Sequence, residues 1–187
     1  MIMTLTRSQD RWMKMSKSFK EIATKHIGPP VNIEAIIRSM GIELDKKADL
    51  ESEISGQLER IGAGKYRISA NKSDHYLRQR FTMAHELGHF LLHAHLIGDG
   101  LDDSRAYRSV ADGKFFNENI GPTQETEANR FAARLLMPKS KLAEQATIDK
   151  ETSQLAKEFQ VSRQAMEIRL QSLGYFIENG AICATPD

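Results

Sequence analysis

The sequence predicts an α+β fold that is mainly helical, with a small antiparallel β-sheet before a histidine-rich helix and a helix-turn-helix-like segment near the C-terminus. Three observations support this prediction. Apolar residues recur at three- and four-residue steps over several long segments, which is typical of amphipathic helices. Two alternating runs, ISGQLERI and KYRISAN, flank a Gly-rich turn and indicate a β-hairpin. Finally, LAKEFQVSRQAMEIRL combines two short helical patterns with a turn between them.

Turn-forming residues separate the expected helices. The first, residues 8–26, ends before Gly28-Pro29-Pro30, and the second, Val31 to Met40, ends at Gly41, a residue suited to a helix C-cap. Residues 98–121 are rich in Gly, Asp, Ser and Asn, so we expect an irregular loop long enough to act as a lid. The remaining helices are expected at 74–95, 122–136, 138–147 and 151–173, followed by a hairpin at 175–183.

Composition argues against several classes of protein. Twenty-six Lys and Arg against twenty-five Asp and Glu give a net charge of +1, so there is no overall attraction to nucleic acid or membrane. The single cysteine, Cys183, cannot form a disulfide within one chain, which suits a reducing compartment. Because no apolar run is long enough for a signal peptide or a membrane span, we expect a cytoplasmic protein without a membrane partner. The sequence specifies no oligomeric state.

The segment FTMAHELGHFLLHAH, residues 81–95, holds four of the six histidines of the chain. His85 and His89 flank Glu86 in the pattern HExxH. Positions four apart share one face of a helix, so both imidazoles can bind one cation while Glu86 lies beside it. Zinc suits this pattern, because a catalytic zinc site has three protein ligands and keeps one position for water. The alternative is a helix that is merely rich in histidine, and a third ligand would separate the two interpretations.

Two histidines farther along the same helix are less suitable as the third ligand. His95 stands where an extended HExxHxxGxxH pattern has its last histidine, but position 92 is Leu and not the Gly at which such chains turn. The helix is therefore expected to continue and to carry His95 out of reach. His93 lies one turn beyond His89, too far along a straight helix to share its cation. We expect His93 to form a hydrogen bond beside the site, with a solvated helix end as the alternative.

A better source of the third ligand is GPTQETEANRFAARLLMP, residues 121–138. Glu127 shares a helical stripe with arginines three and seven positions on, which is typical of an exposed row of ion pairs. Glu125 lies on the packing face, where a carboxylate is costly to bury unless a cation compensates it. We therefore expect Glu125 to bind the metal. Asn129, one turn later, is expected to accept a hydrogen bond from the other ring nitrogen of a ligand histidine and so fix its tautomer.

Three motifs together resemble the ImmA/IrrE-like metallopeptidases: RFTMAHELGHFLLH, ETEANRFAARLLMP and VSRQAMEIRLQSLG. These are intracellular gluzincin-type enzymes, often encoded in phages and mobile elements, and the resemblance spans about residues 30–175. It implies a zincin-like fold, His85 and His89 as ligands, Glu86 as catalytic base and Glu125 as third ligand. It also implies a protein substrate, because characterised members cleave helix-turn-helix repressors.

The expected organisation has three parts: an N-terminal helix at residues 1–28, a zincin-like metallopeptidase core at 29–148 and a C-terminal helical hairpin packed on the core at 149–187. The expected cofactor is Zn2+, with another divalent transition metal such as Mn2+ as the alternative. Glu86 would take a proton from the attacking water, and Tyr76, His93 and Tyr107 are unranked candidates for stabilising the oxyanion. A further hypothesis is that substrate binds as an added strand along residues 65–71.

The C-terminal segment supports a rival function. Arg163, Gln164 and Arg169 could face a DNA duplex in a helix-turn-helix, which would make the chain a DNA-binding or protein-docking module with a non-catalytic metal site. However, the same apolar spacing suits any packed helical hairpin, and Glu158 and Glu167 dilute the positive charge. Packing on the core is therefore favoured, docking of a substrate protein comes second, and direct nucleic-acid binding is not expected.

Overall fold

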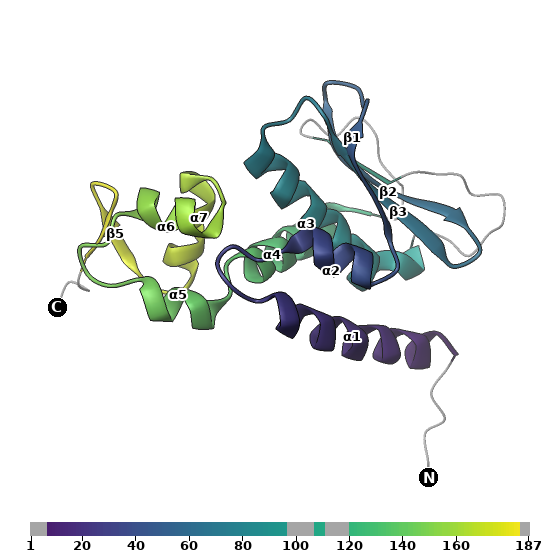
Figure 1. The fold of residues 1–187 in the computed structure, drawn as a ribbon, viewed down its shortest axis with the longest axis horizontal. Helices are drawn as coiled ribbons and strands as arrows, with labels where there is room; N and C mark the ends of the chain where they lie inside the picture. Colours follow the sequence, from purple (N-terminus) through teal and green to yellow (C-terminus); the bar gives the residue numbers. More distant parts are fainter. Residues whose placement is uncertain (1–6, 97–106, 111–119, 184–187) are drawn as a thin grey trace, which may run out of the picture.

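The computed structural model describes residues 7–96, 107–110 and 120–183. The fold is α+β, as predicted, and the helices divide between a group beside the main sheet and a group next to the C-terminal hairpin (Figure 1). The helices are α1 (Arg7–His26), α2 (Ile33–Ser39), α3 (Tyr76–His93), α4 (Pro122–Leu136), α5 (Lys139–Gln145), α6 (Thr152–Phe159) and α7 (Arg163–Ser172), with a 3-10 turn at Ala94–Leu96. The strands are β1 (Glu43–Ala48), β2 (Ile54–Gly62), β3 (Lys65–Asn71), β4 (Tyr107–Val110), β5 (Phe176–Glu178) and β6 (Ala181–Cys183).

The main sheet is mixed, so the prediction of an antiparallel sheet is only partly right. The predicted hairpin forms β2 and β3, but β1 pairs with β3 in parallel, and the strand order is β1-β3-β2-β4. The connection from β1 to β2 passes across the end of β3. Asn71 holds it there, because its side-chain amide donates to the carbonyl oxygens of Leu50, Glu51 and Ile54 at 3.2, 3.0 and 2.8 Å.

Strand β4 was not predicted, since its four residues lie in a segment that the sequence indicates to be irregular. It pairs antiparallel with β2 and forms one edge of the sheet in the described part of the chain. Strand β3, by contrast, lies between β1 and β2. The hypothesis that substrate adds as a strand along residues 65–71 is wrong, because β1 and β2 already use both hydrogen-bonding edges of that strand.

Helix α3 forms the centre of the fold. The sheet covers one side of it through residues such as Leu58 and Ile68, and α4 packs on another side (Figure 1). The helices approach closely at Gly88, where an added Cβ would lie 3.3 Å from the Ala128 Cα. Because α3 is buried over most of its length, the polar residues of its middle and last turns are buried as well.

The C-terminal helices expected at 138–147 and 151–173 appear as α5, α6 and α7, and the expected closing hairpin appears as β5 and β6. Its turn carries Asn179 and Gly180, both with positive φ (50° and 85°), as the Asn-Gly pair predicts. The turn between α6 and α7 is tied to α3. Arg80, which is buried, donates through Nε to the Gln160 carbonyl oxygen at 3.1 Å, and the Tyr76 hydroxyl donates to the Gln160 side chain at 2.9 Å.

Candidate metal centre

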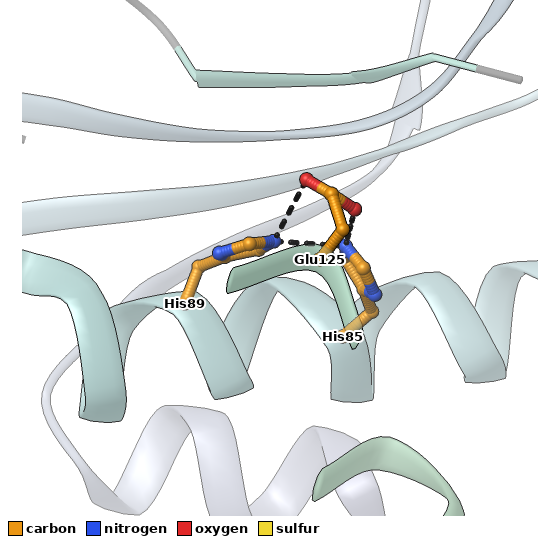
Figure 2. Close-up of side chains that lie close together, drawn as sticks. All are labelled: His85, His89 and Glu125. Carbon is orange, nitrogen blue, oxygen red and sulfur yellow. Dashed lines mark hydrogen bonds and ion pairs between the residues drawn. The ribbon is translucent and has the colours of Figure 1, made fainter. Parts of the chain in front are cut away.

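The expected ligand residues converge on one point between α3 and α4. His85 and His89 lie four residues apart on α3, and their Nε2 atoms are 2.9 Å from each other. Glu125, in the first turn of α4, reaches over both rings, with one oxygen 3.3 Å from His85 Nε2 and the other 3.5 Å from His89 Nε2 (Figure 2). One ligand atom from each of the three residues lies within 4.8 Å of the other two. Three such donors match a zinc site that keeps a position for water.

The electrostatics of these three residues favour a bound positive charge. Burial alone would raise the pKa of Glu125, but hydrogen bonds from His85 and His89 outweigh it and lower the pKa to about 2. Burial lowers the pKa of His89 to about 4. For His85, burial acts in the same direction, yet the hydrogen bond to Glu125 and the nearby carboxylates raise the pKa overall. A divalent cation would satisfy the ionised carboxylate while leaving both imidazoles neutral.

Glu86 provides a test of whether these residues fit a metal. Its side chain is fully buried, and neither carboxylate oxygen has a hydrogen-bond partner among the described residues. Burial raises its pKa to about 8. A buried carboxyl without partners is costly, and a water held beside the His85–His89 pair is the kind of partner that it lacks. The residues present therefore fit a hydrolytic metal site.

Each histidine of the pair has a hydrogen bond on the ring nitrogen that faces away from Glu125. His85 Nδ1 lies 2.9 Å from Asn129 Oδ1, the contact that the sequence predicts. His89 Nδ1 lies 3.0 Å from His93 Nδ1, and His93 is buried, not solvated at a helix end. If Nε2 of each ligand histidine faces a cation, its Nδ1 carries the proton and donates outward, which fixes the tautomer.

Glu127 is the residue whose role the sequence pattern misassigned. Its carboxylate lies 2.9 Å from His93 Nε2, so it is not simply part of an exposed ion-pair row, although about half of its side chain (51%) is exposed. Helical periodicity within α4 describes only the helix's own faces. The contact depends on how α4 aligns with the last turn of α3, and no local pattern encodes that alignment.

The remaining sequence candidates do not join the cluster. Helix α3 continues without a turn at Leu92, as expected, and the side chain of His95 lies outside the described residues. Tyr76 stands at the start of α3 and donates to Gln160, and both ring nitrogens of His93 are engaged behind His89. The side chain of Tyr107, like the expected lid region at 97–106 and 111–119, lies outside the described part of the chain.

The cluster opens into a cleft of about 670 Å³. Its lining includes His85, Glu125 and Asn129 as well as residues of the α6–α7 turn and of α7, among them Ile168. This volume falls in the range of ligand-binding pockets. His85 and Glu125 are therefore accessible from a cleft large enough for part of a polypeptide.

Comparisons with known proteins agree with this geometry. The Peptidase_M78 family model, described as the IrrE N-terminal-like domain, matches residues 33–171. A solved structure, a Mycobacterium tuberculosis transcriptional regulator, has a similar fold with a TM-score of 0.55 at 18% sequence identity. The match covers 87% of this chain and 47% of that chain, so this chain spans about half the length of the regulator. No curated protein gives a significant match.

In the part of the chain that the structure describes, no helix combines the length and the apolar character that a membrane span requires.

Proposed function

Because the chain belongs to the Peptidase_M78 family of IrrE N-terminal-like domains, we propose that it is a zinc-dependent endopeptidase. One observation carries this proposal: His85, His89 and Glu125 converge near the buried, unpartnered Glu86, and His85 and Glu125 line a cleft. A site that only stabilised the fold would not need a buried carboxyl without a partner. Mn2+ is the alternative metal, since the same nitrogen and oxygen donors also bind it.

The side chains divide the work of hydrolysis. Nε2 of His85, Nε2 of His89 and the Glu125 carboxylate would hold the zinc, which when bound supplies a Lewis acid that acidifies water and polarises the scissile carbonyl. Glu86 accepts the proton of the attacking water and delivers it to the departing amine. Asn129 and His93 hold the two imidazoles in the tautomer that presents Nε2.

The proposed substrate is a cytoplasmic helix-turn-helix repressor. The support is the resemblance of the three motifs to the ImmA/IrrE-like enzymes, together with membership of a peptidase family. The solved neighbour is a transcriptional regulator, but at 18% identity it supports the fold alone. We also propose a three-part organisation, with the N-terminal helix at residues 1–28, the peptidase core at 29–148, and residues 149–187 packed on that core.

Direct DNA binding by α7 is disfavoured by its contacts. Arg163 Nε pairs with Glu167 at 2.7 Å, and Arg169 Nε donates to the Met137 carbonyl oxygen at 3.2 Å. Gln164 lines the cleft that leads to the metal cluster. The three residues that would contact a duplex are thus paired or turned toward the peptidase site.

Metal content of identically purified variants tests the proposal. Wild type should hold about one zinc per chain, Glu125→Ala should lose most of it, and Glu127→Ala should retain more, because Glu127 only contacts His93. Glu86→Gln should keep zinc but lose cleavage. New protein N-termini that appear in cells expressing wild type should therefore be absent from cells expressing this variant. If wild type binds no divalent metal even when zinc is supplied, the peptidase proposal fails.

A further inference from the structure

The cleft connects the metal cluster to a part of the chain that hydrolysis does not require. Five of its lining residues come from the α6–α7 turn and the first two turns of α7, between Val161 and Ile168. These positions are where a DNA-binding helix-turn-helix carries its base-reading residues. Here they form a wall of the peptidase cleft.

This wall is apolar where it faces α3. Leu77 and Phe81 of α3 line the cleft together with Val161, Ala165 and Ile168. Ile168 is 60% exposed, which makes it one of the most exposed large hydrophobic residues in the described chain. The arginine of the lining, Arg78, already pairs with Asp74 at 3.4 Å and donates to Ser55 at 2.9 Å. An exposed isoleucine inside a concave site indicates binding of an apolar group.

The wall is also held in place. Arg80 bridges the Gln160 carbonyl oxygen and, through Nη2, the Val31 carbonyl oxygen at 2.9 Å. Ser162 caps α7 by accepting from the Ala165 backbone N–H at 3.1 Å. A subsite with fixed walls loses less entropy when it binds a chain.

We propose that α7, through Ile168, forms an apolar subsite that binds a Leu-, Ile-, Met- or Phe-type side chain of the polypeptide substrate held in this cleft. The C-terminal helix pair then recognises protein and not DNA. The inference rests on the proposed peptidase function. It adds the type of substrate side chain that the cleft selects, and it names α7 as the helix that selects it.

The test measures binding separately from cleavage. Zinc-loaded Glu86→Gln protein is titrated with a panel of fluorescent twelve-residue peptides that differ only at one central residue, Ala, Leu, Phe, Asp or Lys. The Leu and Phe peptides should bind at least about tenfold more tightly than the Asp peptide. Adding Ile168→Asp should abolish this preference without changing zinc content. Ile148→Asp is the matched control, since Ile148 is similarly exposed (62%) but does not line the cleft.

The outcomes separate the two proposals. An apolar preference that persists in Ile168→Asp, or the absence of any binding to the panel, overturns the subsite. If the preference behaves as expected but zinc-loaded wild type, with Glu86 intact, cleaves none of the bound peptides, the subsite stands and the peptidase proposal fails.

Discussion

His93 Nε2 lies 2.9 Å from the Glu127 carboxylate, while His93 Nδ1 lies 3.0 Å from His89 Nδ1. If a cation binds His89 Nε2, the proton of His89 is on Nδ1, and this N–H donates a hydrogen bond to His93 Nδ1. The proton of His93 is then on Nε2, and that N–H donates a hydrogen bond to Glu127. In the proposed metal site, a half-exposed carboxylate would thereby act on the buried His89 through a second histidine and make His89 a more basic ligand.

Glu127→Ala should therefore weaken zinc binding by about tenfold, the lower end of the range for such outer contacts because Glu127 is half-exposed. Glu127→Gln, which keeps an acceptor oxygen but not the charge, should weaken it less. Competition with a chelating dye measures the affinity, and nitrogen NMR of the imidazoles reports the tautomer of His93. Arg130→Ala, on the same helix, is the control. Equal affinities for Glu127→Ala and the control would mean that the contact has no effect on the metal.

The stability of the metal-free protein should depend on the ionisation of Glu86. Its pKa is raised from 4.5 to about 8 by burial. Below pH 4.5 folded and unfolded chains both hold the proton, and stability is unaffected. Between pH 4.5 and 8 the unfolded chain releases the proton while the folded chain keeps it, so the free energy of unfolding falls as pH rises.

Glu86→Gln should remove that loss. In chelator, the variant should match wild type near pH 4.5 and exceed it by a few kcal/mol near pH 8, because each pKa unit corresponds to about 1.4 kcal/mol. Urea unfolding at several pH values measures the difference. Glu144→Gln, at an exposed position of α5, should keep the pH slope of wild type. A constant difference between Glu86→Gln and wild type across this range would show that Glu86 is not buried as described.

Gly56 lets β2 pack directly on α3 beside the site. An added Cβ would collide with Thr82 Cγ2 and would lie 3.1 Å from the Ser69 carbonyl oxygen and 3.3 Å from Glu86 Oε1. Gly56→Ala should destabilise the protein by about 1–3 kcal/mol. Thr82→Ser removes the colliding methyl group, so the double variant should recover part of the loss in thermal unfolding. Gly62→Ala, at the end of the same strand with open space around it, should change little. Strictly additive effects of the two substitutions would contradict this packing.

The sequence predicted features that are encoded locally. The helical period around HELGH located α3, and the apolar face of α4 was sufficient to distinguish Glu125 from Glu127 as the residue that lies beside the histidine pair. Likewise, Asn179-Gly180 specified the closing turn through its backbone preferences. In each case the relevant pattern lies within one helix or one turn, so residue spacing carried the information.

Features that depend on contacts between distant segments were missed. Strand β1 pairs in parallel with β3, which lies between β1 and β2. The order of strands in a sheet has no counterpart in the spacing of residues along the sequence. Strand β4 is only four residues long and is defined by its pairing with β2. The hydrogen bond between His93 and Glu127 requires the alignment of two helices, and its partners are 34 residues apart in the chain. These relationships follow from packing, which a single sequence does not display.

Arg80 determines whether the α7 wall stays fixed relative to the metal cluster. It is buried (4% exposed) and donates to the carbonyl oxygens of Gln160 and Val31, so Arg80→Met would fill similar space but leave both acceptors without their donor. We expect a loss of about 2–4 kcal/mol in unfolding free energy, since two hydrogen bonds to a charged group are removed. Zinc content should persist, because the ligands come from α3 and α4, whereas amide exchange at residues 161–165 should accelerate and the preference for apolar peptides should weaken. Arg80→Lys keeps the charge but cannot span both carbonyls, so it should fall between wild type and Arg80→Met. Unchanged amide exchange in Arg80→Met would show that the turn between α6 and α7 is held by its apolar core alone.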